Sequence, residues 1–100
     1  MEAIRVTDII GTNFDLEDAI LLRGYVEKDL DEELILDFAG IYRVPTTFLC
    51  CLLTDLINKN GRDYVASHIH IKNLKNISDY SRVLLGTAFI EDSVLNSIIN

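Results

Sequence analysis

Residues 34–57 decide the fold, and they read Leu34-Ile-Leu-Asp-Phe-Ala-Gly-Ile-Tyr-Arg-Val-Pro-Thr-Thr-Phe-Leu-Cys-Cys-Leu-Leu-Thr-Asp-Leu-Ile57. The nearly continuous apolar run Leu34–Phe38 is too short for a helix, which is typical of a buried central strand. After a short turn and Pro45, apolar residues recur at i, i+3, i+4, i+7 and i+8, the spacing of one stripe on an amphipathic helix. The members of this stripe are Leu49, Leu52, Leu53, Leu56 and Ile57. The stretch therefore predicts a strand, a turn and a helix.

Before this unit, the sequence predicts an edge strand and a helix. Ala3–Ile10 alternates loosely between apolar and polar residues, as a half-exposed strand does. A turn at residues 11–13 follows, and Asn13 or Asp15 is a suitable cap for the next helix. The predicted apolar stripe of that helix is Leu16, Ala19, Leu22, Val26 and Leu30. The acidic segment Asp29–Glu33 is expected to be a solvated loop.

After this unit, the sequence predicts a third strand and two further helices. The helix over residues 46–60 is expected to end at Lys59-Asn60-Gly61, and Val65–Ile71 is the predicted strand. Ser78 or Asp79 would then cap a helix with an apolar face. That face consists of Ile77, Tyr80, Leu84, Leu85 and Ala88, and an amphipathic last helix carries Val94, Leu95, Ile98 and Ile99. The order β-α-β-α-β-α-α predicts a single α/β domain over residues 1–100 with a small, mainly parallel sheet.

The composition limits the classes of partner. The formal net charge is -7, which argues against nucleic-acid binding and against an anionic membrane surface. An acidic mimic of DNA stays open as an alternative. The mean hydropathy of +0.22 suggests that apolar surface is left for a partner or a second copy. The sequence shows no signal peptide pattern and no apolar run long enough to span a membrane. We therefore expect a cytoplasmic protein.

Three groups of residues are candidates for chemistry. Asp37, inside the central strand, is expected to be a structural carboxylate that accepts backbone N–H groups of a nearby turn. His68 and His70, on one face of the predicted third strand, have the spacing of two Zn²⁺ ligands but no third ligand nearby, so no metal site is predicted. Cys50 and Cys51 are expected to be buried free thiols. We therefore expect no cofactor and no enzyme activity.

Thr46 and Thr47 stand at the start of the helix after the central strand, where open α/β folds place their sites. Either hydroxyl can cap the helix by accepting a hydrogen bond from a free backbone N–H. Either can also be a phosphorylation site, because a helix N-terminus favours a phosphate group. Both readings stay open, since one threonine can cap while the other is exposed.

The pattern Leu34-Ile-Leu-Asp-Phe-Ala-Gly-Ile, a short turn and then Thr-Thr-Phe-Leu resembles the STAS superfamily, which includes the anti-sigma-factor antagonists. It is most similar to the STAS-like family of unknown function, as are Arg23-Gly24 and Ile71-Lys-Asn-Leu74. In antagonists the second serine of Asp-Ser-Ser-Gly is phosphorylated by a kinase that is also the binding partner, and Thr47 matches that serine. Pro45 and Phe48 stand where the motif has its aspartate and its glycine, so this chain departs from the motif at two positions.

The resemblance implies a bacterial-type, non-catalytic regulatory module that binds a protein, such as a kinase-like ATPase or a transcriptional regulator. The predicted binding residues are Tyr42, Arg43, Pro45, Thr46, Thr47 and Phe48, extended by Asp29–Glu33 if that loop lies nearby. Alternative hypotheses are a self-associating assembly protein, including a homodimer, and a small mobile-element inhibitor of a host protein. A small enzyme or redox protein that uses Asp37, His68, His70 or Cys50 is a further alternative.

Overall fold

A computed structural model describes residues 1–87. In chain order, its elements are β1 (Glu2–Arg5), α1 (Val6–Ile10), α2 (Leu16–Asp29), the short 3-10 helix η1 (Leu30–Glu32), β2 (Leu34–Asp37), α3 (Thr46–Asn60), α4 (Arg62–His68), β3 (Ile69–Lys72) and α5 (Ile77–Leu85). The predicted fold class, α/β with a small parallel sheet, is confirmed. Ala88 and the predicted last helix with Val94, Leu95, Ile98 and Ile99 lie outside the described residues.

The sheet has the order β1-β2-β3, and both strand pairs are parallel. The stretch that begins at Leu34 therefore forms the central strand, and β1 lies at an edge. Alternate residues on the strands face opposite sides of the sheet. Ile4, Leu34, Leu36 and Ile69 are buried on one side. On the other side, Arg5, Asp37 and Lys72 lie in one row of Cα partners that is open to solvent.

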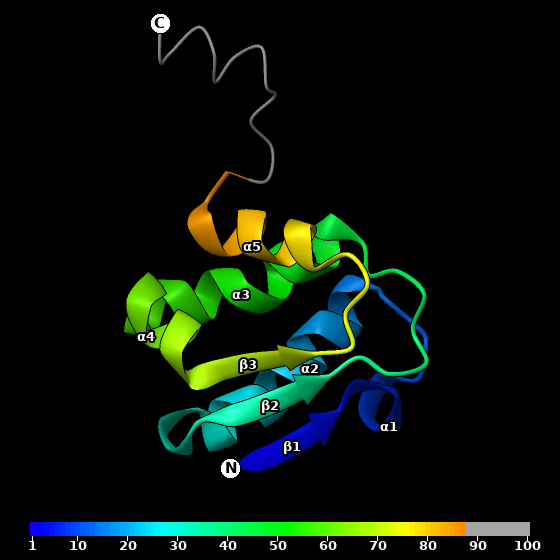
Figure 1. Cartoon of the computed structure of the whole chain (residues 1–100), viewed down its shortest axis with the longest axis horizontal. Helices are drawn as coiled ribbons and strands as arrows, with labels where there is room; N and C mark the ends of the chain where they lie inside the picture. Colours follow the sequence, from blue (N-terminus) through cyan, green and yellow to red (C-terminus); the bar gives the residue numbers. More distant parts are fainter. Residues whose placement is uncertain (88–100) are drawn as a thin grey trace, which may run out of the picture.

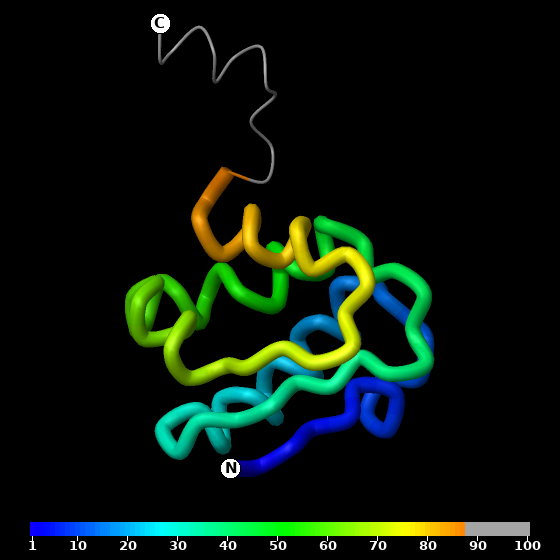
Figure 2. The backbone as a smooth tube through the Cα atoms, in the orientation of Figure 1, coloured from blue at the N-terminus to red at the C-terminus, as the bar shows by residue number. Residues whose placement is uncertain are grey.

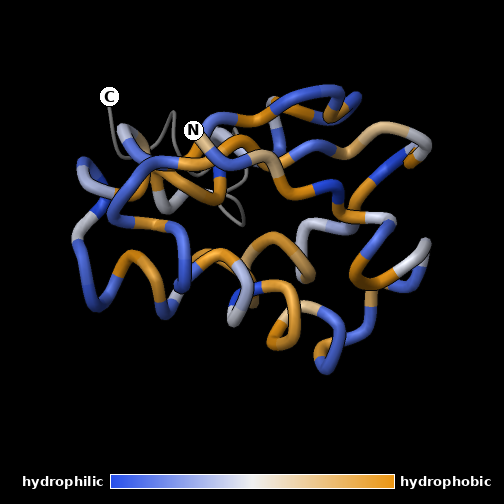
Figure 3. The backbone as a smooth tube through the Cα atoms, turned by 90° about the horizontal axis from the view of Figure 1, so that it is seen from below, coloured by the Kyte–Doolittle hydropathy of each residue, from blue (hydrophilic) through white to orange (hydrophobic). Residues whose placement is uncertain are grey.

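The helices cover the buried side of the sheet. The strands are added in chain order from β1 to β3, and each connection between parallel strands is a right-handed crossover. Both crossovers therefore place their helices, α2 and the α3–α4 pair, on the same face of the sheet. Figure 1 shows α3 above the strands, α2 behind them and α5 on top of α3. Seen from below in Figure 3, hydrophobic segments recur along both strands and helices. The sheet and the helices thus enclose one hydrophobic core.

The prediction of one strand over Ala3–Ile10 is wrong in its second half. Only Glu2–Arg5 is a strand, and Val6–Ile10 is a helix that ends when the N–H of Gly11 donates to the carbonyl of Thr7 at 3.0 Å. Val6 and Ile10 are both buried. They are four residues apart, which places them on one face of a helix as well as on one face of a strand.

The predicted strand over Val65–Ile71 is also wrong in its first part, where α4 runs to His68 and β3 begins only at Ile69. The end of α3 was predicted correctly at Asn60. Gly61 follows with a φ of 88°, a backbone conformation that glycine adopts without strain. A second helix can therefore start at once in a new direction.

Two details of the helices differ from the prediction. Ala19, Leu22, Val26 and Leu30 of the predicted α2 stripe are buried, but Leu16 is 64% exposed. The N-cap position of α5 is Asn76 rather than Ser78 or Asp79, because the helix starts two or three residues earlier than the polar pair suggested, and no side chain caps it. Its buried residues are Tyr80 and Val83, while Ile77 and Leu85 are exposed. Asp15 is the N-cap of α2, as predicted for one of two candidates.

Candidate interaction site at the carboxyl ends of the strands

Two loops meet at the carboxyl ends of β2 and β3. Residues 38–45 join β2 to α3, and residues 73–76 join β3 to α5. Figure 2 shows the two loops side by side at the right of the molecule. An open cleft of about 630 Å³ lies between them, and its walls are Ala39, Gly40, Ile41, Tyr42, Asn73, Leu74 and Lys75. In open α/β folds this edge of the sheet is where ligands and partners bind.

The side chain of Asn76 fastens the first loop to the second. Its Oδ1 accepts the backbone N–H of Val44 at 3.1 Å, and its Nδ2 donates to the carbonyl of Val44 at 2.7 Å. The same Nδ2 donates to Asp79 Oδ2 at 3.0 Å, which ties the contact to the first turn of α5. Val44 itself is fully buried. Because both polar groups of its backbone are paired, the loop holds a defined shape just before α3 begins.

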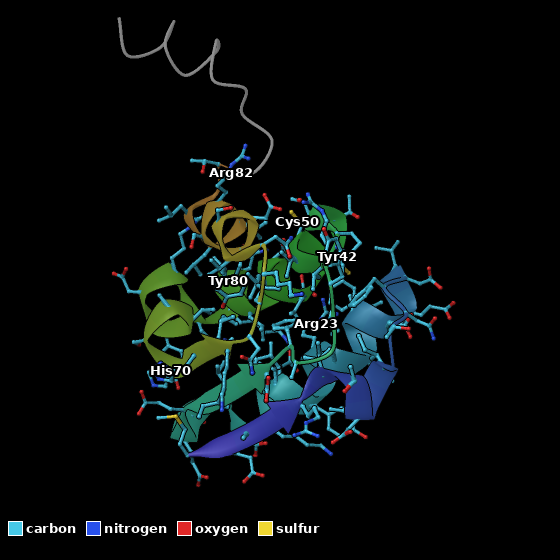
Figure 4. The ribbon with its side chains drawn as sticks, turned by 45° about the vertical axis from the view of Figure 1, so that its right-hand side comes forward. Arg23, Tyr42, Cys50, His70, Tyr80 and Arg82 are labelled. Carbon is cyan, nitrogen blue, oxygen red and sulfur yellow. The ribbon has the colours of Figure 1, made fainter. Side chains whose placement is uncertain are left out.

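Tyr42 and Arg43 are the exposed side chains of the first loop. Tyr42 is 83% exposed, and the Nζ of Lys75 lies 5.2 Å from the centre of its ring. Figure 4 shows Tyr42 on the loop that leads into α3. The guanidinium of Arg43 pairs with Asp79 at 3.3 Å while remaining 63% exposed. Both residues are thus positioned by the second loop and by α5, yet face solvent.

The helix start differs from the capping prediction. Pro45 is the N-cap of α3, and no side chain caps the helix, so neither threonine hydroxyl has that role. Proline supplies no side-chain acceptor, and both threonines already belong to the first turn of the helix. Thr47 is exposed and Thr46 half-buried. Whether either is phosphorylated stays a prediction.

Phe48 was placed in the binding surface by the sequence analysis, but its side chain is buried, with 1% exposure. Its ring packs edge-on against Phe14, with the centroids 5.1 Å apart and the planes at 87°. As an aromatic residue on the core side of α3, it anchors the helix start rather than forming part of the surface. The exposed surface is therefore made by Tyr42, Arg43, Pro45 and Thr47, with Thr46 at its edge.

Asp37 lies at the end of β2, below the cleft. Its Oδ1 accepts the backbone N–H of Ala39 at 2.9 Å and the Nδ2 of Asn73 at 2.9 Å. The pKa of this carboxyl group is lowered, and the hydrogen bond from Asn73 is the largest cause. The hydrogen bond from Ala39 and the charges of Lys72 and Arg5 lower the pKa further. The carboxylate therefore links the ends of β2 and β3 and shapes both loops.

The prediction that His68 and His70 share one face of a strand is wrong, because only His70 lies in a strand. His68 ends α4, and its ring stacks on Tyr64 with the centroids 3.8 Å apart. His70 lies in β3 with its Nε2 3.1 Å from Glu33 Oε1, at the other end of the sheet from Tyr42 (Figure 4). Among residues 1–87 no group of three metal-ligating side chains comes together.

The cysteines and the acidic segment lie away from the cleft walls. Cys50 and Cys51 are half-buried free thiols on α3, and burial raises the pKa of the Cys50 thiol, with a smaller effect of Cys51. Asp29–Glu33 precedes β2, so it lies at the amino end of that strand, whereas the cleft follows the carboxyl end. The prediction of a solvated loop is wrong here, because Asp29 ends α2, Leu30–Glu32 forms η1 and Leu30 is buried. This acidic segment therefore does not extend the surface around Tyr42.

Sequence reasoning missed the second loop, because residues 73–76 lie between a predicted strand and a predicted helix and were not among the predicted binding residues. Asn73, Lys75 and Asn76 supply a wall of the cleft, the cation over Tyr42 and the contact with Val44. A usable signal was present: loops that follow adjacent parallel strands meet at one edge of the sheet. Polar residues after β3 therefore had to be considered together with those after β2.

Comparison with known proteins gives one match. A family model described as a STAS-like domain of unknown function (DUF4325) matches residues 18–79, a range that includes both loops of the cleft. Neither curated proteins nor solved structures give a match. No helix within residues 1–87 is long and apolar enough to cross a membrane.

Proposed function

Because the chain belongs to the family of STAS-like domains of unknown function, we propose that it is a non-catalytic regulatory module that binds another protein. The binding surface is the turn and helix start after β2, made by Tyr42, Arg43, Pro45 and Thr47. Its partner is a kinase-like ATPase or a transcriptional regulator, as the similarity to anti-sigma-factor antagonists suggests.

The observation that carries this proposal is an exposed loop with a fixed backbone. Tyr42 is 83% exposed. Two residues later, the backbone N–H and the carbonyl of Val44 are both hydrogen-bonded to the side chain of Asn76. A preformed loop loses little conformational entropy on binding, which favours affinity. Tyrosine and arginine are also the residue types enriched at the energetic centre of protein interfaces.

The charges of this surface fit a partner that presents acidic groups. Lys75 lines the cleft, and Lys75 and Arg43 both line a smaller pocket of about 180 Å³ beside Tyr42, although the whole chain carries a net charge of -7. Asp79 pairs with Arg43, whereas Lys75 contacts only the ring of Tyr42 among the interactions found in the described part of the chain. An acidic group of the partner would therefore meet a cation that has no carboxylate beside it.

Regulation by phosphorylation of Thr47 forms part of the proposal. Thr47 is exposed in the first turn of α3, and that turn contains no acidic residue. A phosphate group there would be attracted by the free N–H groups of the helix start and would not be repelled by a neighbouring carboxylate in the turn. The modification would change the charge of the binding surface without unfolding the helix.

The test is a pull-down of the tagged chain from extract of its native cells, followed by identification of co-eluting proteins and by mass spectrometry of the chain. We expect one stoichiometric ATPase or regulator, lost with Tyr42→Ala. Leu85→Ala is the control, because Leu85 is also a large, mostly exposed side chain, at 67%, and lies outside this surface.

The outcomes separate the parts of the proposal. Capture that is equal for Tyr42→Ala and Leu85→Ala would contradict the surface, and the absence of any stoichiometric partner would contradict the binding role. A partner captured by a chain that never carries phosphate on Thr47 would contradict the regulatory part alone. Thr47→Asp should weaken capture if the phosphate acts by its charge.

A further inference from the structure

The outward side of α2 carries an unusual set of exposed apolar residues. Ile20, Leu21 and Tyr25 are 51%, 49% and 44% exposed, although Ala19, Leu22 and Val26 of the same helix are fully buried. At about 100° per residue, Glu17, Ile20, Leu21, Gly24, Tyr25 and Lys28 fall within an arc of about 140° opposite the buried stripe. We call these six residues the outer face of α2.

Gly24, in the middle of this face, has no neighbour within residues 1–87 that would require a glycine. Glycine lowers the stability of a helix interior relative to alanine, so its presence needs a reason. A Cβ atom at this position would have no atom within 4 Å, and no neighbour in the described part of the chain therefore requires the missing side chain. The glycine leaves a gap between Leu21 and Tyr25, into which another helix can fit.

The outer face is complementary to itself. Consider two copies of α2 that pair in antiparallel fashion about the midpoint between Leu22 and Arg23. Leu21 of one copy then lies opposite Gly24 of the other, and Ile20 lies opposite Tyr25. In the same register Glu17 lies opposite Lys28. Within residues 1–87, Glu17 has no recorded hydrogen bond or ion pair, and Lys28 contacts only the ring of Tyr25. Both charges are thus available for a partner.

We propose that the outer face of α2 is the interface of a two-fold symmetric dimer, in which Leu21 of each copy fills the gap over Gly24 of the other. Two Glu17–Lys28 ion pairs close the ends of this contact. A symmetric interface uses the same patch on both copies, and this requires the self-complementarity that the face possesses. Arg23 and Glu27, at the edge of the face, pair with Asp55 and Lys59 of α3 and hold α2 in place.

The test is analytical ultracentrifugation of the full chain over a range of concentrations. We expect a reversible dimer. Gly24→Gln fills the gap with a good helix former, so it should keep or raise the thermal midpoint and weaken the dimer about tenfold or more. Asn58→Gln, at an exposed position of α3, is the control and should leave the association constant unchanged.

Charge exchange tests the register. Glu17→Lys and Lys28→Glu should each weaken the dimer about tenfold, because two ion pairs become two like-charged contacts. The double variant should restore association, since each pair is then attractive again. A chain that is monomeric at every concentration would overturn the proposal. A dimer that is unaffected by Gly24→Gln and by both single charge variants would overturn it as well.

Discussion

Replacement of Asn76 by alanine should lower the free energy of unfolding by about 3 kcal/mol. The side chain makes three hydrogen bonds, at 3.1 and 2.7 Å to the backbone of Val44 and at 3.0 Å to Asp79. A typical hydrogen bond contributes about 1 kcal/mol net, and unpaired buried groups cost more. Val44 is fully buried, but Asn76 is only half-buried. Water can therefore replace some of the lost hydrogen bonds. For this reason we expect a loss of about 1 kcal/mol for each of the three bonds, without the larger cost of fully buried unpaired groups.

Asn76→Asp separates the hydrogen bonds from the shape of the side chain. The aspartate can still accept the N–H of Val44, but it cannot donate to the Val44 carbonyl or to Asp79, and its charge is placed beside a second carboxylate. We expect a loss similar to that of alanine at neutral pH. The pKa of the new carboxyl group should be raised in the folded state, so its protonated form is favoured, and stability should recover as the pH falls toward 4.

The assay is urea unfolding followed by circular dichroism, with Asn58→Ala as the matched control. Asn58 is exposed on α3, and alanine is the better helix former, so this variant should unfold at an equal or slightly higher urea concentration. The reasoning would be refuted if Asn76→Ala and Asn58→Ala unfolded at the same urea concentration. A loss of binding without a loss of stability would equally contradict the view that Asn76 acts by holding the loop.

Three further predictions concern single side chains. The Tyr80 hydroxyl is buried without a hydrogen-bond partner in residues 1–87, so Tyr80→Phe should raise the free energy of unfolding by about 1 kcal/mol; a lower thermal midpoint would contradict this. The pKa of Asp37 is lowered, chiefly by its hydrogen bond from Asn73. Its stabilising contribution is therefore present above about pH 4 and lost as the pH falls through the folded pKa. The difference in urea midpoint between the wild type and Asp37→Asn should then shrink below that pH, and a constant difference would be inconsistent with this. Burial raises the pKa of the Cys50 thiol, so less of it is in the reactive thiolate form. In a Cys51→Ser background, alkylation of Cys50 by iodoacetamide at pH 8 should therefore be slower in the folded chain than in urea. Equal rates would show that folding does not raise this pKa.

The central strand and the helix after it could be predicted because their signals are local. Leu34–Asp37 is a short, mostly apolar strand between a turn and a glycine, and α3 shows its stripe over more than two turns. The two false strand predictions have one cause. Val6 and Ile10, like Val65 and Ile69, are separated by four residues, a spacing that puts both side chains on one face of a helix and also of a strand. In short segments the pattern cannot decide between the two.

The candidate site was only half predictable, because its second wall comes from another part of the chain. Asn76 and Val44 are 32 residues apart, and no local pattern indicates that their hydrogen bonds form. The burial of Phe48 was missed for a related reason. It packs against Phe14, a contact between two segments that sequence periodicity treats separately, so the position at the helix start looked exposed.

The two proposed surfaces lie on different elements, and this makes a joint consequence testable. The cleft is built from the loops after β2 and β3, whereas the outer face belongs to α2. A dimer through α2 would present two copies of the Tyr42 surface in a fixed relation, so a partner that is itself dimeric would gain affinity through the second contact. Gly24→Gln should then reduce binding to a dimeric partner but leave binding to a monomeric fragment of it unchanged. Tyr42→Ala should reduce both, because it removes the contact itself.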